Sequence, residues 1–181
     1  MSKVVFIIAT PNPSSRLNGI TDYFHQELVN RGIDTDTISV TSLPAEDLIL
    51  ARWDSPAIAE ANALVESADA VVIASPVYKA SYSGILKTYL DLLPQKGLVD
   101  KIVAPVFIGG TIAHLLSIDY SLKPVLSAIG ARNFISPIYA TDNQVVRSQD
   151  HAAAFTLADE LIDRLNRSIE ELVSDLRLIS R

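Results

Sequence analysis

The sequence predicts a single doubly wound α/β domain that spans residues 1–181. Two observations predict this fold class. Short, continuous apolar runs recur along the chain, as is typical of parallel strands that are covered on both faces. Between these runs, apolar residues follow the spacing of amphipathic helices, and such an alternation of strand and helix indicates a parallel sheet. A chain of 181 residues buries a sizeable core but is too short for two ordinary domains.

The first half of the chain supplies three of five predicted strands. Residues 4–9 are β-branched and apolar throughout, so we expect a covered strand there. Residues 21–31 have the apolar spacing of a helix, and a glycine follows to end it. Residues 33–40 alternate apolar and polar side chains, as an edge strand does. A Ser-Pro pair opens a helix over 55–67, and the apolar run 70–74 is the third strand.

The second half adds two strands and three helices. Residues 83–93 form a predicted helix that a proline halts, and residues 102–108 are the fourth apolar strand. A helix over 113–129 and a fifth strand over 134–139 follow. The last predicted helix runs from about residue 151 to 179, and its apolar residues recur in alternating steps of four and three. Its far end is longer than a five-stranded sheet can cover, so we expect it to contact another subunit.

The composition excludes several classes of function. The chain has no cysteine, which excludes disulfides, thiolate metal sites and thiol catalysis. That composition is compatible with the cytoplasm, where we expect the protein. No spacing of histidine and carboxylate side chains indicates a metal site. A net charge of −6 gives no electrostatic footprint for nucleic acid, and no apolar run approaches the roughly 20 residues of a membrane span.

The loop after the first strand, residues 9–19, decides between the two common orders of a doubly wound sheet. A dinucleotide-binding fold would carry Gly-x-Gly-x-x-Gly there, and this loop has neither that motif nor a Walker lysine. It is rich in hydroxyl and amide side chains and contains one arginine, a composition that binds a monophosphate at a helix N-terminus. An ordinary capped turn is the alternative. We therefore predict a flavodoxin-like three-layer sandwich with a five-stranded parallel sheet of order 2-1-3-4-5.

Two further loops are expected at the same edge of the sheet, because the carboxyl ends of parallel strands meet there. Pro76 to Lys79 follow the third strand and offer an apolar floor, an aromatic face and one cation. Gly109 to Thr111 follow the fourth strand, and paired glycines let a planar ligand approach the backbone closely. Together these loops suit a flat, partly apolar, anionic ligand such as a flavin nucleotide.

Three long segments carry a resemblance to a known family. Ser75 to Pro94, Gly109 to Leu126 and Ala45 to Pro56 resemble the NADPH-dependent FMN reductases of the sulfonate-utilisation type. The resemblance extends to about residue 145. It implies FMN bound at the strand edge and hydride transfer from NADPH, with NADH as the other possible donor. It also implies that reduced FMN passes to a partner flavin-dependent monooxygenase.

The resemblance assigns the FMN contacts to the three loops. Relatives usually have Ser or Thr directly after the arginine, where this chain has Leu17, and Asn18 or backbone amides would replace that hydroxyl. The implied residues are Thr10, Ser15, Arg16 and Asn18 at the phosphate, Pro76, Val77, Tyr78 and Lys79 along the ring and ribityl chain, and Gly109, Gly110, Thr111 and His114 at the pyrimidine edge.

Tyr120 lies in the middle of the predicted helix over 113–129. In the resembled family, the matching tyrosine is an insertion that creates a π-helical bulge at a tetramer interface close to the flavin. The resemblance therefore implies a homotetramer and a role for Tyr120 in flavin exchange. No general base is required, because the flavin and the nicotinamide carry the hydride chemistry.

Two other functions fit the same residues. A flavodoxin-type electron carrier would hold FMN permanently and would have no nicotinamide site. Such carriers tend to be more acidic and to sandwich the flavin between aromatic rings, for which Trp53 and Tyr78 are the accessible candidates. A quinone or azo reductase would hold FMN tightly and reduce a different acceptor. No clamp for a 2′-phosphate can be located, so both NADPH and NADH stay open as donors.

Overall fold

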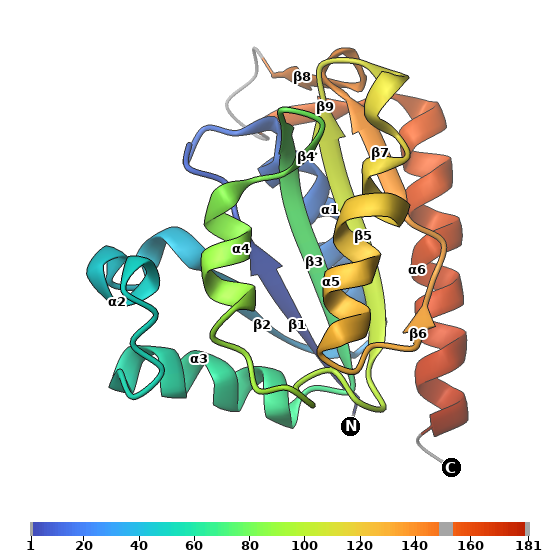
Figure 1. Cartoon of the computed structure of the whole chain (residues 1–181). Helices are drawn as coiled ribbons and strands as arrows, with labels where there is room; N and C mark the ends of the chain where they lie inside the picture. The colour runs from blue at the N-terminus through green and yellow to red at the C-terminus, as the bar shows by residue number, and fades with distance from the viewer. Residues whose placement is uncertain (1, 149–153, 180–181) are drawn as a thin grey trace.

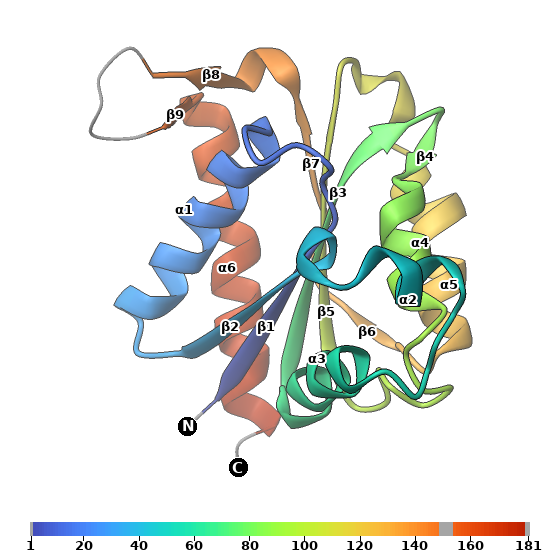
Figure 2. The same ribbon diagram turned by 90° about the vertical axis from the view of Figure 1, so that its left-hand side faces the viewer.

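The central sheet lies between two layers of helices in the computed structural model, which describes residues 2–148 and 154–179. Figure 2 shows the sheet edge-on, with helices on either side. One face is covered by α1 (Arg16–Asn30) and α6 (Asp159–Ile179), and the other by α3 (Pro56–Ser67), α4 (Gly84–Leu90) and α5 (Lys123–Ala128), with the short α2 (Ala45–Ile49) beside them. The three-layer α/β prediction is therefore confirmed.

The sheet has seven strands, and its path follows the order β2-β1-β3-β5-β6. The strands on this path are β2 (Asp34–Ser39), β1 (Lys3–Ile8), β3 (Ala70–Tyr78), β5 (Ile102–Gly109) and β6 (Asn133–Phe134). All neighbours on the path are parallel, and β7 (Ile138–Thr141) also pairs with β5 in parallel. The short β4 (Ser81–Tyr82) pairs antiparallel with β3.

The predicted sheet of five strands in the order 2-1-3-4-5 is wrong in its strand count and numbering. An extra strand, β4, arises because the chain turns back through Lys79 and Ala80 and pairs with the end of β3. The predicted last strand is interrupted between β6 and β7 by a segment that contains Pro137. Proline has no N–H to donate, so Pro137 cannot contribute a ladder hydrogen bond at that point.

The C-terminal helix begins later than predicted. The sequence pattern placed its start at about His151, which lies outside the described residues, but α6 begins at Asp159. Before it, β9 (Phe155–Leu157) pairs antiparallel with β8 (Val145–Arg147) as a separate hairpin. The predicted contact of the far end with another subunit stays a prediction: Leu176 is buried in the chain's own core, whereas Leu178 and Ile179 are exposed.

The predicted helix over 113–129 is broken into three pieces. A 3-10 turn at Ile112–His114 is followed by a π-helical turn at Ile118–Leu122, and only then does α5 begin. The π-helical turn contains Tyr120, so the expected π-helical bulge at this residue is confirmed. In the first helix the error is at the start, because α1 begins at Arg16 and not at residue 21.

The hydrophobic core has two halves, one on each face of the sheet. Along β1, Val4 and Phe6 belong to the half under α1 and α6, whereas Val5 and Ile7 belong to the half under the opposite helices. This alternation follows from the period of two in a strand. Among the residues that the structure describes, no helix has the length and apolar character needed to cross a membrane.

Candidate functional site

A cleft of about 220 Å³ lies at the carboxyl edge of the sheet, the upper edge in Figure 1. The loops after β1, β3 and β5 meet there, as predicted. The cleft is lined by Asn12, Ser14, Ser15, Arg16, Pro76, Val77, Tyr78, Ile108, Gly109, Gly110, Asp142 and Arg147. The candidate site residues that do not line it are Thr10, Asn18, Lys79, Thr111, His114 and Tyr120.

The first loop is shaped by hydrogen bonds within itself. The Asn12 Oδ1 atom accepts from the Ser14 N–H at 2.9 Å, and the Asn18 side chain donates to the Pro13 carbonyl at 2.7 Å. The Thr10 hydroxyl oxygen lies 3.4 Å from the Asn12 nitrogen, from which it accepts. Asn18 and Thr10 therefore hold the loop in shape, although neither lines the cleft.

The start of α1 presents positive charge to the cleft. Ser15 caps this helix by accepting from the Leu17 N–H at 3.2 Å, and the first turn contains no acidic residue. The Leu17 side chain is fully buried in the core, so position 17 does not contribute a side chain to the cleft. Arg16 is exposed and makes no hydrogen bond or ion pair within the described part of the chain. A free guanidinium beside a helix N-terminus is a favourable environment for an anion.

A buried serine network joins the first loop to the second. The Ser83 hydroxyl donates to the Ala9 carbonyl at 2.8 Å and accepts from the Leu86 N–H at 3.3 Å. The Ser83 N–H in turn donates to the Ser75 hydroxyl at 2.8 Å, and that hydroxyl donates to the Pro76 carbonyl. The sequence analysis did not single out these serines. Their only signal is that they flank the Pro-Val-Tyr-Lys turn.

The turn between β3 and β4 has an unusual backbone. Lys79 and Ala80 have φ values of 50° and 63°, in the left-handed region that residues with a Cβ rarely adopt. The turn leaves Tyr78 49% exposed, with Val77 half-buried behind it on the cleft wall. Lys79 is exposed at the turn itself.

The third loop rests on Tyr139. The Tyr139 hydroxyl donates to the Thr111 carbonyl at 2.7 Å, and a Cβ on Gly109 would collide with that hydroxyl. Burial raises the pKa of Tyr139, with the Asp142 carboxylate adding to the shift, so the hydroxyl stays protonated and continues to donate. A Cβ on Gly110 would meet only Asp142, at 3.9 Å. The backbone at Gly110 is therefore open to close approach by a ligand.

Arg147 is a lining residue that the sequence analysis missed. It comes from β8, and its Nη2 atom donates to the Ser14 carbonyl of the first loop at 2.6 Å, across 133 residues of sequence. Figure 2 shows the β8–β9 hairpin beside the start of α1. The segment has no motif that would place an arginine here.

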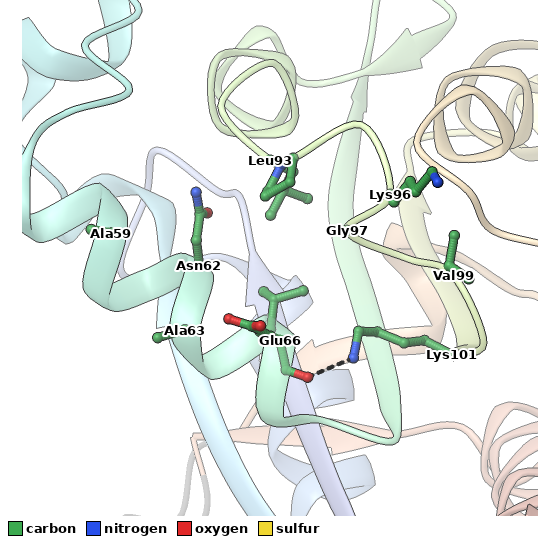
Figure 3. A pocket seen from close by; sticks show the side chains of 11 residues that line it. Ala59, Asn62, Ala63, Glu66, Leu93, Lys96, Gly97, Val99 and Lys101 are labelled. Atoms are coloured by element: carbon green, nitrogen blue, oxygen red, sulfur yellow. Dashed lines mark hydrogen bonds between the residues drawn. The ribbon is translucent and has the colours of Figure 1, made fainter.

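A larger cavity, of about 400 Å³, lies between α3 and residues 93–101, at the opposite edge of the sheet (Figure 3). Two of its polar side chains, Asn62 and Lys101, are engaged within the protein. Lys101 donates to the carbonyls of Glu66 and Ala68 at the end of α3, and desolvation lowers its pKa. Asn62 donates to the Leu92 carbonyl. Glu66 and Lys96 also line this cavity, but none of the predicted site residues does.

The cleft contains groups that bind, and no set of groups that carries out acid–base or nucleophilic chemistry. Within residues 2–148 and 154–179, no cluster of three or more His, Asp or Glu side chains could hold a metal ion. Helix N–H groups and two arginines lie toward one end, and an open glycine backbone with an aromatic wall lies beside them. This arrangement suits a flat ligand that ends in an anion.

The comparisons with known proteins agree with such a ligand. The family model of NADPH-dependent FMN reductases matches residues 2–145. An FMN reductase (NADPH) from Pseudomonas putida is 45% identical over 92% of this chain and 84% of its own length. The crystal structure of an NADH:FMN oxidoreductase, EmoB, in its apo form superposes with a TM-score of 0.84 at 29% identity, covering 95% of this chain and 88% of that one. Flavodoxin 1 from Bacillus cereus, with a TM-score of 0.64 and 13% identity over 96% and 98% of the two chains, shares the fold.

Proposed function

This chain belongs to the NADPH-dependent FMN reductase family and reduces FMN with NADPH or NADH, and from this premise we propose that FMN binds in the cleft at the carboxyl edge of the sheet. The observation that carries the proposal is the Arg16 guanidinium at the N-terminus of α1, which has no partner among the described residues and lines the same cleft as the open Gly110 backbone. The Arg16 guanidinium at the helix N-terminus suits a phosphate. The open backbone at Gly110 suits the close approach of a flat flavin ring.

The phosphate end of FMN would be held by Arg16, Ser15 and the N–H groups at the start of α1. The fork of a guanidinium binds phosphate oxygens in pairs, and the helix dipole favours the negative charge. Thr10 and Asn18 would act by keeping the loop in shape, consistent with their hydrogen bonds inside it.

The flavin ring would lie between the wall of Pro76, Val77 and Tyr78 and the backbone of Gly109 and Gly110. Lys79, Thr111 and His114 are adjacent to these loops in sequence and would contact the ligand at its margin. When bound, FMN would supply the redox chemistry as the acceptor of a hydride from the nicotinamide. The protein would contribute orientation, and backbone N–H groups at Gly109 and Gly110 would stabilise negative charge on the reduced ring.

We further propose that reduced FMN is delivered to a partner flavin-dependent monooxygenase and that the protein is a homotetramer. The tetramer proposal is supported by an exposed apolar surface around the π-helical turn. Tyr120 is 79% exposed there, and the other members of this surface are Ile112, Leu115 and Leu116. Large apolar side chains exposed close together in sequence are consistent with an interface. Tyr120 would then act in flavin exchange.

Steady-state kinetics test the proposed site. NADPH consumption should rise with added free FMN and saturate. Arg16→Gln should raise the KM for FMN by about tenfold to a hundredfold, because a charge-assisted hydrogen bond is lost. The KM for riboflavin, which has no phosphate, should stay unchanged.

An unchanged KM for FMN in the Arg16→Gln variant would contradict the proposed site. A rate of NADPH oxidation that does not depend on added FMN would favour a quinone or azo reductase. No oxidation of NADPH or NADH would favour an electron carrier.

A further inference from the structure

The β8–β9 hairpin places an arginine against the loop proposed to bind phosphate. Arg147 pairs with Phe155 across the hairpin, and its guanidinium carbon lies 5.6 Å from the centre of the Phe155 ring. Its Nη2 atom donates to the Ser14 carbonyl at 2.6 Å. The family model ends at residue 145, so Arg147 and its partner strand lie beyond the matched segment.

The position of the hairpin is determined by packing against α1. Val145 is fully buried, and Phe155 packs against the first turns of α1 at Gly19. A Cβ on Gly19 would lie 2.7 Å from the Cβ of Phe155, so a larger residue could not be accommodated without a shift. Glycine inside a helix costs about 1 kcal/mol relative to alanine. Glycine at position 19 thus lowers the stability of the helix but leaves the space that the Phe155 side chain occupies.

The guanidinium of Arg147 has unused donors. A guanidinium has five N–H groups, and in the part of the chain described here Arg147 donates only to the Ser14 carbonyl. It has no carboxylate partner there, and neither does Arg16, which lines the same cleft. The cleft has one carboxylate in its lining, Asp142, which lies beside Gly110 in the third loop. The first loop is therefore flanked by two cations that have no carboxylate partner within residues 2–148 and 154–179.

We propose that Arg147 is a second arginine ligand of the FMN phosphate and sets the preference for FMN over riboflavin. This inference rests on the proposed FMN site. A phosphate monoester carries a charge of about −1.5 to −2 at pH 7, so a second guanidinium matches its charge. The buried Leu17 leaves the phosphate without the hydroxyl that the resemblance leads one to expect, and the hairpin supplies another donor from a distant part of the chain.

Equilibrium binding of FMN and of riboflavin to the purified protein, followed by quenching of flavin fluorescence, tests the inference. Arg147→Gln should weaken FMN binding by about tenfold to a hundredfold and leave riboflavin binding unchanged. Because one charge pair is lost, FMN binding should also become less sensitive to added salt. Arg147→Lys keeps the charge but not the fork, so it should lose less affinity than Arg147→Gln and keep the salt sensitivity of the wild type.

Arg132→Gln is the matched control. Arg132 also donates to backbone carbonyls, but it lies near the start of β6, at the opposite edge of the sheet. The Arg132→Gln variant loses the same charge as Arg147→Gln and should bind FMN like the wild type. If Arg147→Gln binds FMN like the wild type, or weakens FMN and riboflavin equally, or keeps the wild-type salt sensitivity, then Arg147 is not a phosphate ligand.

Arg16→Gln separates this inference from the site on which it rests. If Arg16→Gln weakens FMN binding selectively and Arg147→Gln does not, only the role of Arg147 is wrong. If neither variant changes FMN binding, or the wild type binds FMN and riboflavin equally, the proposed phosphate site and the inference are both wrong.

Discussion

Tyr139 connects the core of the domain to the wall of the cleft. Its side chain is buried, and its hydroxyl donates to the Thr111 carbonyl of the third loop. The same hydroxyl occupies the space that any side chain at position 109 would need, which is why glycine is required there. A single buried side chain thus determines both the course of the loop and its access to a planar ligand.

We predict that Tyr139→Phe lowers the free energy of unfolding by about 1 kcal/mol and weakens FMN binding. One net hydrogen bond is lost, and the Thr111 carbonyl is released from its position. Urea unfolding and FMN fluorescence quenching measure the two effects. Tyr23→Phe is the matched control, because the Tyr23 hydroxyl donates to Asn166 at 2.9 Å between α1 and α6. It should lose similar stability and keep the wild-type affinity for FMN; equal affinity in both variants would contradict a role for Tyr139 in the site.

At the scale of the element, the β3–β4 turn combines strain with function. Alanine in the left-handed region costs about 1–2 kcal/mol, and glycine adopts it freely but gains entropy in the unfolded chain. We predict that Ala80→Gly raises the free energy of unfolding by about 0.5 kcal/mol. FMN binding should weaken by about twofold to tenfold, because a looser turn must be ordered when the ligand binds.

A second alanine with positive φ provides the control for that prediction. Ala51 has a φ of 51° and lies just after α2, away from the cleft lining. Ala51→Gly should raise the midpoint of thermal unfolding as Ala80→Gly does, while FMN binding stays at the wild-type value. A loss of FMN affinity in both variants, or in neither, would show that the turn does not position the ligand.

The elements differ in how well the sequence predicts them, and the reasons are physical. Strand runs such as 102–108 were predicted almost to the residue, because a covered strand must be apolar throughout. The start of α1 was predicted late, since its first turn mixes the buried Leu17 with the polar Arg16 and Asn18, and Ser15 alone marks the cap. The interrupted last strand and the β8–β9 hairpin depend on tertiary contacts, which local patterns do not record.

At the scale of the whole molecule, the topology of the sheet explains which site residues were accessible to prediction. The loops that contain Arg16, Tyr78 and Gly110 follow β1, β3 and β5, and parallel strands bring such loops together. Arg147 belongs to a hairpin beyond the last strand of the sheet, so no topological rule brings it to this edge. It reaches the cleft through the packing of Phe155 on Gly19, a contact between residues far apart in the chain.

The exposed apolar residues around the π-helical turn are the proposed contact between subunits of the tetramer. Leu116 is 58% exposed in the single chain, so a charge there should leave the fold intact, whereas burial in a subunit interface would require that charge to be desolvated. We predict a tetrameric wild type and a Leu116→Glu variant of lower mass, measured by sedimentation equilibrium. Val29→Glu, a matched change on the exposed side of α1, should stay tetrameric. A monomeric wild type, or a Leu116→Glu variant that keeps the wild-type mass, would show that this surface does not join the subunits.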